Sequence, residues 1–188
     1  VSIAGDVYKS TNGKDFYPVR EVNTTRNLVD YQFLAFKRDV NHIWIGGLIN
    51  KGMTTPKILF CNGNNEQWTE YVFENEPDGR AVDVNFPTNQ IGYCLISGSV
   101  NKIYKSTDGG YSWQKLPFEI PIGVRSLAFQ DENTGWQSLD KVIYKTTDGG
   151  NTWQKEFEAE SDIKKLYYTQ NVLYAFADDG LLYRYYFK

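Results

Sequence analysis

Twelve residues of this chain occur twice in nearly the same form. YKSTDGGYSWQK spans 104–115 and YKTTDGGNTWQK spans 144–155, so the copies lie 40 residues apart (144 − 104 = 40). Looser copies are DVYKSTNGKDFYPVREV at 6–22 and KILFCNGNNEQWTEYVF at 57–73, whereas GLLYRYYFK at 180–188 matches only the opening of the unit. Such self-similarity predicts an architecture in which one supersecondary unit is stacked several times.

The spacing of the copies, and the segments between them, define the unit. With Ser106 as the marker, the copies fall near residues 10, 61, 106, 146 and 185, which gives separations of 51, 45, 40 and 39 (61 − 10, 106 − 61, 146 − 106, 185 − 146). Between markers, the segments 79–98 and 124–140 align with Phe86 over Phe129 and Gly92 over Gly135. Each segment shows the pattern of a strand, a polar turn and a second strand.

Each repeat therefore contains four short strands. No segment has sustained 3.6-residue apolar periodicity, and the 16% aromatic content favours strands. We predict an all-β fold, a β-propeller of four-stranded antiparallel blades, with 1–188 as a single domain. Counting strands gives 3 + 12 + 3 = 18 over five blades with short terminal blades. A fragment of a larger propeller is the alternative.

The doubled segment also resembles a known motif. STDGGYSW (106–113) and TTDGGNTW (146–153) match the Asp-box, or BNR repeat, of the form [ST]-x-D-x-G-x-[ST]-W. The repeats resemble the propellers of photosystem II assembly and stability factors and, more distantly, those of sialidases and sortilin-type receptors. Only two boxes are complete, because Asn12 and Lys14 replace the Asp and the Gly in the first copy and CNGNNEQW (61–68) lacks both the Asp and the hydroxyl.

The chemistry of the box indicates a structural role. Asp and Ser or Thr side chains accept backbone N–H bonds in tight turns, glycine provides positive φ, and tryptophan packs across the hairpin. The family resemblance implies that this hairpin lies at the periphery of the blade. The predicted structural residues are Ser106, Asp108, Gly110, Trp113, Thr146, Asp148, Gly150 and Trp153.

Propellers commonly bind ligands at the mouth of the central channel. The segments that lead into the first strand of a blade each carry one cation: Arg26, Arg80, Arg125 and Lys164. If these side chains converge on one face, they would suit carboxylate or phosphate groups of a partner. The register is imperfect, since Arg125 precedes Phe129 by four residues and Arg80 precedes Phe86 by six. Scattered solvated charges are the alternative interpretation.

These features favour a non-catalytic scaffold that recognises a protein or a carbohydrate partner through one face. The resemblance to stability factors implies partner binding. One alternative is a sialidase-like glycoside hydrolase, which needs paired carboxyl groups; another is a propeller domain of a larger surface protein. For the hydrolase, Arg26, Arg80 and Arg125 would form an arginine triad, and the candidate carboxylates are Asp30, Asp78, Asp83 and Asp162.

Several partner classes are disfavoured by composition. The net charge of −3 and the pI near 5.2 do not suit nucleic acid, and no apolar run approaches the roughly 18–20 residues of a membrane span. With one histidine, His42, and with Cys61 and Cys94 lacking metal-ligand spacing, we expect no metal and no cofactor. Both thiols are expected to be buried, although one bridge is possible. We expect a monomer. No signal peptide is visible, but the resemblance implies a secreted, periplasmic or cell-surface location.

Overall fold

The computed structural model describes residues 8–10, 12–18, 29–39, 42–50, 54–62 and 68–187. These residues form five antiparallel sheets and no helix. Sheet 1 contains β1 (Tyr8–Lys9) and β2 (Tyr17–Pro18). Sheet 2 contains β3 (Val29–Asp39), β4 (His42–Asn50), β5 (Thr54–Asn62) and β6 (Thr69–Val72). Sheet 3 contains β7 (Arg80–Asn85), β8 (Gly92–Ser97), β9 (Asn101–Ser106) and β10 (Gln114–Ile120).

Sheet 4 contains β11 (Val124–Phe129), β12 (Gly135–Leu139), β13 (Val142–Thr146) and β14 (Gln154–Glu158). Sheet 5 contains β15 (Ile163–Thr169), β16 (Val172–Ala177) and β17 (Leu182–Tyr186). The predicted all-β class and the four-stranded antiparallel unit are confirmed. Of the three strands predicted before the first full blade, the one at residues 1–4 lies outside the described residues. The number of five blades remains a prediction.

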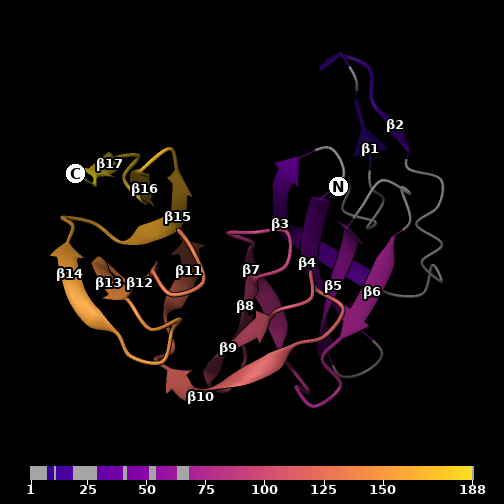
Figure 1. Ribbon diagram of the computed structural model, residues 1–188, viewed down its shortest axis with the longest axis horizontal. Helices are drawn as coiled ribbons and strands as arrows, with labels where there is room; N and C mark the ends of the chain where they lie inside the picture. Colours follow the sequence, from indigo (N-terminus) through magenta and orange to yellow (C-terminus); the bar gives the residue numbers. More distant parts are fainter. Residues whose placement is uncertain are drawn as a thin grey trace.

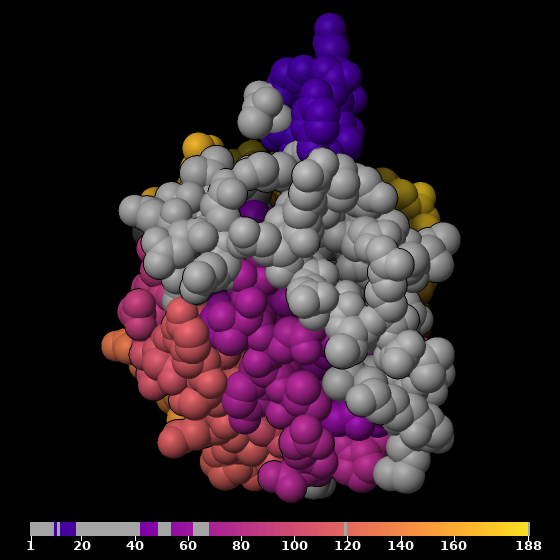
Figure 2. Space-filling view, turned by 90° about the vertical axis from the view of Figure 1, so that its right-hand side faces the viewer, coloured from indigo at the N-terminus to yellow at the C-terminus, as the bar shows by residue number. Residues whose placement is uncertain are grey.

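Sheets 2 to 5 follow one another around an arc (Figure 1). The first strands β3, β7, β11 and β15 contact one another from sheet to sheet and lie towards the inside of the arc, whereas β6, β10 and β14 lie outside. The β1–β2 hairpin projects beyond the arc (Figure 2). Because sheets 2, 3 and 4 are antiparallel meanders of four strands, the chain returns to the same face after each of them. The first strands β3, β7, β11 and β15 therefore begin at one face of the molecule and end at the other.

Neighbouring sheets are joined by a repeated aromatic stack. The ring of Trp44 in β4 stacks on Phe86 with centroids 3.8 Å apart, and Tyr93 in β8 stacks on Phe129 at 3.5 Å. A wider pair joins Trp136 to Tyr168 at 5.5 Å. All of these rings except Tyr168 are at most 2% exposed. The stacks therefore form the core between the sheets and offset the entropic cost of ordering short strands.

The alignment of Phe86 with Phe129 and of Gly92 with Gly135 has a direct cause. A Cβ atom on Gly92 would lie 2.3 Å from the Phe86 ring, and one on Gly135 would lie 2.4 Å from Cδ1 of Phe129. Each phenylalanine ring thus lies over the glycine that opens the next strand of its own sheet. Glycine is required here by close approach rather than by backbone conformation.

The two complete boxes have nearly the same hydrogen bonds. Ser106 Oγ donates to Asp108 Oδ1 at 2.8 Å and accepts from the Gly110 amide at 2.9 Å. Asp108 Oδ2 accepts from Ser112 Oγ at 2.6 Å. Thr146, Asp148, Gly150 and Thr152 repeat these contacts at 2.8, 2.9 and 2.6 Å. Gly110 and Gly150 have φ of 105° and 90°, which a side chain would disfavour. In both turns, the hydroxyl and carboxylate side chains thus hold the backbone in place through short-range hydrogen bonds.

The first copy is a shortened box. Asn12 Oδ1 accepts from the amides of Lys14 and Asp15, both at 2.9 Å. Tyr17 pairs with Lys9, as Gln114 pairs with Lys105. Counting from Ser10 and Ser106, the sequence aligns Tyr17 with Trp113, but this strand pairing shifts the register by one residue and places Phe16 at the position of the tryptophan. The Phe16 side chain is 62% exposed, so this hairpin has the turn of the repeat without its packing.

Candidate functional site

The first strands of sheets 3, 4 and 5 share a bulge close to where they begin. The strand pairing skips Val82 in β7, Arg125 in β11 and Lys164 in β15. A bulge inserts one residue into a strand and redirects the neighbouring side chains. Since the bulges fall at the same place in each sheet, they define equivalent positions. We call the end of the molecule at which these strands begin the strand-start face.

The predicted cations are only partly equivalent. Arg125 and Lys164 occupy matching bulge positions, but the matching residue in β7 is Val82 rather than Arg80, which lies two residues earlier. Arg80 and Arg125 are exposed and form no ion pair with any residue that the structure describes. Lys164 forms an ion pair with Asp178. Arg26 lies outside the described residues.

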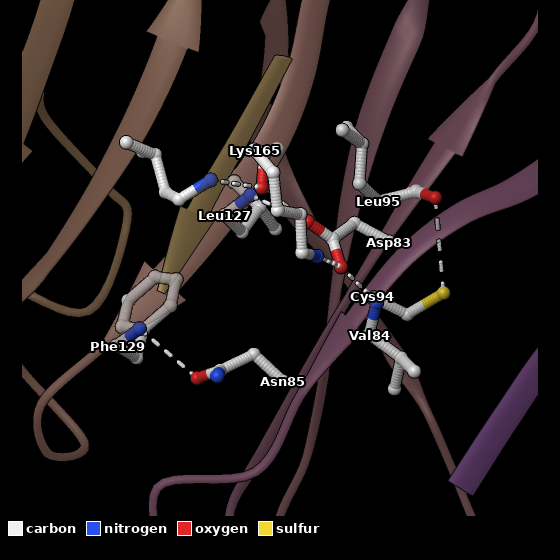
Figure 3. Close-up of polar contacts among 10 residues, drawn as sticks. Asp83, Val84, Asn85, Cys94, Leu95, Leu127, Phe129 and Lys165 are labelled. Carbon is white, nitrogen blue, oxygen red and sulfur yellow. Dashed lines mark hydrogen bonds and ion pairs between the residues drawn. The ribbon is translucent and has the colours of Figure 1, made fainter. Parts of the chain in front are cut away.

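A buried carboxylate joins the three first strands next to the bulges (Figure 3). Asp83 is 1% exposed. Its Oδ2 accepts from Ser126 Oγ at 2.6 Å and from the Leu127 amide at 3.0 Å, whereas its Oδ1 accepts from the Val84 amide at 2.9 Å and from Lys165 Nζ at 2.6 Å. The carboxylate thus contacts sheets 4 and 5 as well as its own sheet.

Ser126 extends this network to sheet 5. Its hydroxyl donates to Asp83 and accepts from the Leu166 amide at 3.0 Å. Asn85 forms a parallel link, because its Oδ1 accepts from the Phe129 amide at 2.9 Å. We call Asp83, Ser126 and Lys165 the axial cluster. Its hydrogen bonds connect the edges of adjacent first strands, which do not pair with one another as a sheet.

The axial cluster is structural rather than catalytic. The Asp83 carboxylate accepts four hydrogen bonds, which is about the full capacity of its lone pairs. A buried and fully occupied carboxylate has no free site for a substrate proton. Ser126 is 0% exposed, so it cannot reach a substrate. The suggestion that Asp83 is a glycosidase carboxylate is therefore not supported by its geometry.

Sequence reasoning missed the cluster although a signal was present. Asp83 precedes Phe86 by three residues, as Ser126 precedes Phe129 and Lys165 precedes Tyr168. A polar residue thus recurs at the same position in the three first strands, three residues before the stacked aromatic ring. A first strand whose inner edge is buried needs partners for the polar groups of that edge. A polar residue that recurs at one position of these strands is the detectable sign of that need.

The boxes lie at the face opposite the strand-start face. The Gly109 amide donates to the Gln90 carbonyl at 2.8 Å, and the Gly149 amide donates to Asn133 at 2.8 Å, so each box contacts the turn after the first strand of its own sheet. Trp44 also reaches across from sheet 2, because its Nε1 donates to the Gly109 carbonyl at 2.9 Å. The boxes therefore hold turns and adjacent sheets together.

The box carboxylates are stabilised in their charged form. Partial burial raises the pKa of Asp108, but hydrogen bonds led by those from Ser112 outweigh this effect and leave the pKa below its ordinary value. For Asp148, the hydrogen bond from the Thr152 hydroxyl is the largest contribution and lowers the pKa. Both carboxylates thus act as charged hydrogen-bond acceptors in a turn.

Other candidate chemistry has simple explanations. His42 Nε2 lies 3.2 Å from Asn89 Nδ2, and its ring is stacked beside Trp44. Cys61 and Cys94 are buried and not joined in a disulfide, and burial raises the pKa of the Cys94 thiol. In the described ranges, no three His, Cys, Asp or Glu side chains form a group suited to a metal ion. Nor do these ranges contain a helix of the length and hydropathy that a membrane crossing requires.

Comparison with solved structures identifies the fold. A structure of YCF48 bound to a D1 peptide matches 85% of this chain at 20% identity with a TM-score of 0.59. YCF48 from Cyanidioschyzon merolae matches 99% at 14% identity with a TM-score of 0.64. A Trypanosoma rangeli sialidase mutant with trans-sialidase activity matches 95% at 12% identity with a TM-score of 0.56. The chain spans 51%, 65% and 42% of these structures, respectively, and thus less than two thirds of each.

Sequence comparison adds no closer assignment, because no family model and no curated protein matches the chain. The resemblances predicted from the repeats are confirmed at the level of the fold, since both YCF48 and a sialidase are among the structural matches. The assignment of the two complete turns to the Asp-box rests on their sequence and on their hydrogen bonds. The repeated meanders and these matches together show that the chain has a β-propeller fold.

Proposed function

We propose that this chain is a non-catalytic propeller that binds a protein partner through its strand-start face. The proposal rests on the exposure of Arg80 and Arg125 and on their unneutralised charge. Both are exposed, both lie at or near the beginning of a first strand, and neither is neutralised by a described residue. Guanidinium groups in this state are well suited to bidentate contacts with carboxylates.

An exposed apolar side chain lies in the turn that precedes Arg125. Ile122, in the turn that leads into β11, is 71% exposed. The turn is held in place by Asn101, whose Nδ2 donates to the Pro121 carbonyl at 3.0 Å and to the Val124 carbonyl at 3.3 Å. Exposed apolar side chains near arginine are characteristic of protein interfaces. A prearranged turn also lowers the entropic cost of binding.

A peptide partner suits this chemistry better than a cleaved sugar. One of the structural matches is YCF48 in complex with a D1 peptide, and this supports a peptide as the class of ligand. The glycosidase alternative draws on fold matches alone, to a sialidase at 12% identity and to the Niastella koreensis GH74 enzyme at 18% identity. One of the candidate carboxylates of the hydrolase, Asp83, is not available for catalysis because it is fully hydrogen-bonded in the axial cluster. We therefore propose a peptide that presents carboxylate groups.

Selection from a displayed library of random peptides provides probes for this face. We expect the selected peptides to be rich in Asp, Glu or free C-terminal carboxylate, and their affinity to fall with increasing salt. The double variant Arg80→Ala/Arg125→Ala should bind them about ten-fold more weakly or worse, which corresponds to about 1.4 kcal/mol. Lys115→Ala, an exposed cation on β10, is the matched control. Selected peptides that bind the double variant as well as the unmodified chain would contradict the proposal.

A further inference from the structure

The first copy of the repeat differs from the two complete boxes in one functional group. Residues 10–13 read STNG, whereas the complete boxes read STDG at 106–109 and TTDG at 146–149. Asn12 thus carries a side-chain amide where Asp108 and Asp148 carry a carboxylate, and a glycine follows in every copy. The carbon of an amide is an electrophile, and glycine leaves the neighbouring backbone nitrogen free of steric hindrance. The first copy therefore places a reactive Asn-Gly pair in the turn of the box.

The turn surrounds the side-chain oxygen of Asn12 with hydrogen-bond donors. Its Oδ1 accepts from the amides of Lys14 and Asp15, both at 2.9 Å, and from the Ser10 hydroxyl at 3.2 Å. Negative charge develops on this oxygen when a nucleophile adds to Cγ of the asparagine. Donors that are already in place where such charge develops stabilise the addition, as an oxyanion hole does. The turn therefore favours attack on the Asn12 side chain.

The nucleophile and the leaving group are held in the same turn. The Gly13 amide, which is the nucleophile, donates to Ser10 Oγ at 2.8 Å. Asn12 Nδ2, which is the leaving nitrogen, donates to Asp15 Oδ2 at 2.7 Å. Because a carboxylate only accepts hydrogen bonds, Asp15 fixes the orientation of the amide and keeps Oδ1 towards its donors. Asn12 is exposed, and a Cβ added to Gly13 would meet nothing within 4 Å, so water can reach the reacting atoms.

We propose that Asn12 is a site of spontaneous deamidation in the folded chain, and that the box turn promotes the reaction. The Gly13 nitrogen attacks Cγ of Asn12, and its proton passes to solvent. The Cγ–Nδ2 bond then breaks, and the nitrogen leaves as ammonia. The resulting five-membered succinimide takes up water at either of its two carbonyl carbons and opens to aspartate or to isoaspartate at position 12. The net reaction consumes water and releases ammonia, and it requires no other reactant.

The complete boxes have the same turn but resist this reaction. Asp108 and Asp148 each have a pKa below the ordinary value, so both are ionised at neutral pH. An ionised carboxylate is a poor electrophile, because it already carries the negative charge that attack by a nucleophile would add. The same hydrogen-bonded turn is therefore inert with aspartate and reactive with asparagine. Opening of the succinimide to aspartate converts the STNG of the first copy into the STDG of a complete box.

Both products should weaken the β1–β2 hairpin. The hydrogen bond from the amide to Asp15 is replaced by a contact between two carboxylates, and like charges repel each other at this distance. Isoaspartate also places the side-chain methylene in the main chain, which lengthens the turn between two strands that pair only through Tyr8–Pro18 and Lys9–Tyr17. Deamidation thus adds a negative charge and loosens the strand pairing at the same place.

A second Asn-Gly pair in the chain provides an internal reference. In Asn62–Gly63, the position of the box hydroxyl is taken by Cys61, and Asn62 pairs with His42 at the end of β5. We would incubate the intact chain at mildly alkaline pH and follow both sites by peptide mapping with mass spectrometry. Asn12 should deamidate about ten-fold faster than Asn62 or more in the folded chain, and the two rates should be similar in urea. Equal rates in the folded chain would overturn the proposal.

The products and one variant test the mechanism. Fragmentation of the peptide should reveal both isoaspartate and aspartate at position 12, whereas aspartate alone would mean direct hydrolysis without attack by Gly13. Ser10→Ala removes a donor to Asn12 and the acceptor of the Gly13 amide, and it should slow the reaction about three-fold or more without changing the rate at Asn62. Ser99→Ala, a change at another exposed serine, is the matched control and should have no effect. An unchanged rate in Ser10→Ala would contradict the role of the turn.

Comparison of the folded and unfolded chains tests the turn even if Ser10→Ala opens the hairpin. Folding should slow deamidation at Asn62, because a paired strand restricts the backbone. At Asn12, the folded chain should react at least as fast as the chain in urea, since the turn supplies the donors. A rate at Asn12 that is several-fold lower in the folded chain than in urea would show that the turn protects the asparagine, and would overturn the proposal.

Discussion

Asp83 Oδ1 and Lys165 Nζ lie 2.6 Å apart although the two residues are separated by 82 positions in the sequence. Asp83 belongs to sheet 3 and Lys165 to sheet 5, so the ion pair joins two sheets that are separated along the chain by sheet 4. The Lys165 side chain is 42% exposed and that of Asp83 is 1% exposed. One buried carboxylate therefore fixes the relative positions of three repeats near the axis of the molecule.

Removal of this carboxylate should destabilise the chain strongly. Asp83→Ala would leave Ser126, Lys165 and two backbone amides without their acceptor, and we expect a loss of about 3–5 kcal/mol in the free energy of unfolding. Lys165→Met should cost less, about 1–2 kcal/mol, because the lysine is partly solvated and Asp83 keeps three donors. Urea denaturation measures both changes. A larger effect for Lys165→Met than for Asp83→Ala would contradict the arrangement described.

The two box tryptophans should differ in importance. Trp113 is buried between sheets 2 and 3, so Trp113→Ala should cost about 3–5 kcal/mol. Trp153 is only partly buried, and Trp153→Ala should cost less. Thermal and urea unfolding of the two variants provide the comparison, with Trp113→Phe as a control that retains an aromatic ring. Equal losses at the two positions would show that burial does not set the cost.

The box carboxylates should contribute to stability at neutral pH and lose that contribution in acid. A carboxyl group whose pKa is lower in the folded chain stabilises the fold above its ordinary pKa, here 3.8, and ceases to do so as the pH falls through the folded value. Thr152→Val removes the main hydrogen bond to Asp148, so the pKa of Asp148 should rise towards 3.8. Carboxyl NMR titration measures this shift, with Asp108 as the internal reference that should not change.

Gly135 should not tolerate even alanine. Its added Cβ would lie 2.4 Å from Phe129, and that ring is 2% exposed and stacked on Tyr93. We expect Gly135→Ala to cost about 1–3 kcal/mol through overpacking. Gly98→Ala is the matched control, because the nearest atom to its added Cβ, the Val100 carbonyl oxygen, would lie 3.7 Å away. Its change in the free energy of unfolding should stay within about 0.5 kcal/mol. Similar midpoints in urea for both variants would argue against the close approach.

The sequence alone determined the repeating unit because the unit depends on local chemistry. Ser106, Asp108 and Gly110 form a turn through contacts within a few residues, and the alternation of apolar residues defines strands by their period of two. Comparison of the repeats also identifies Gly92 and Gly135 as equivalent, whereas the phenylalanine ring that lies over each glycine is seen only in the folded chain. Local rules of this kind are repeated wherever the motif is repeated, so they can be detected by self-comparison.

Tertiary structure decided how the repeats are joined and which side chains are available. The bulges give Arg125 in β11 and Lys164 in β15 equivalent positions, whereas the equivalent residue in β7 is Val82 rather than Arg80. No local sequence pattern encodes this difference. Asp83 changed from a candidate catalytic group to a buried acceptor because its partners come from two other sheets. Contacts over such distances in sequence depend on packing between sheets, and only the folded chain brings these residues together.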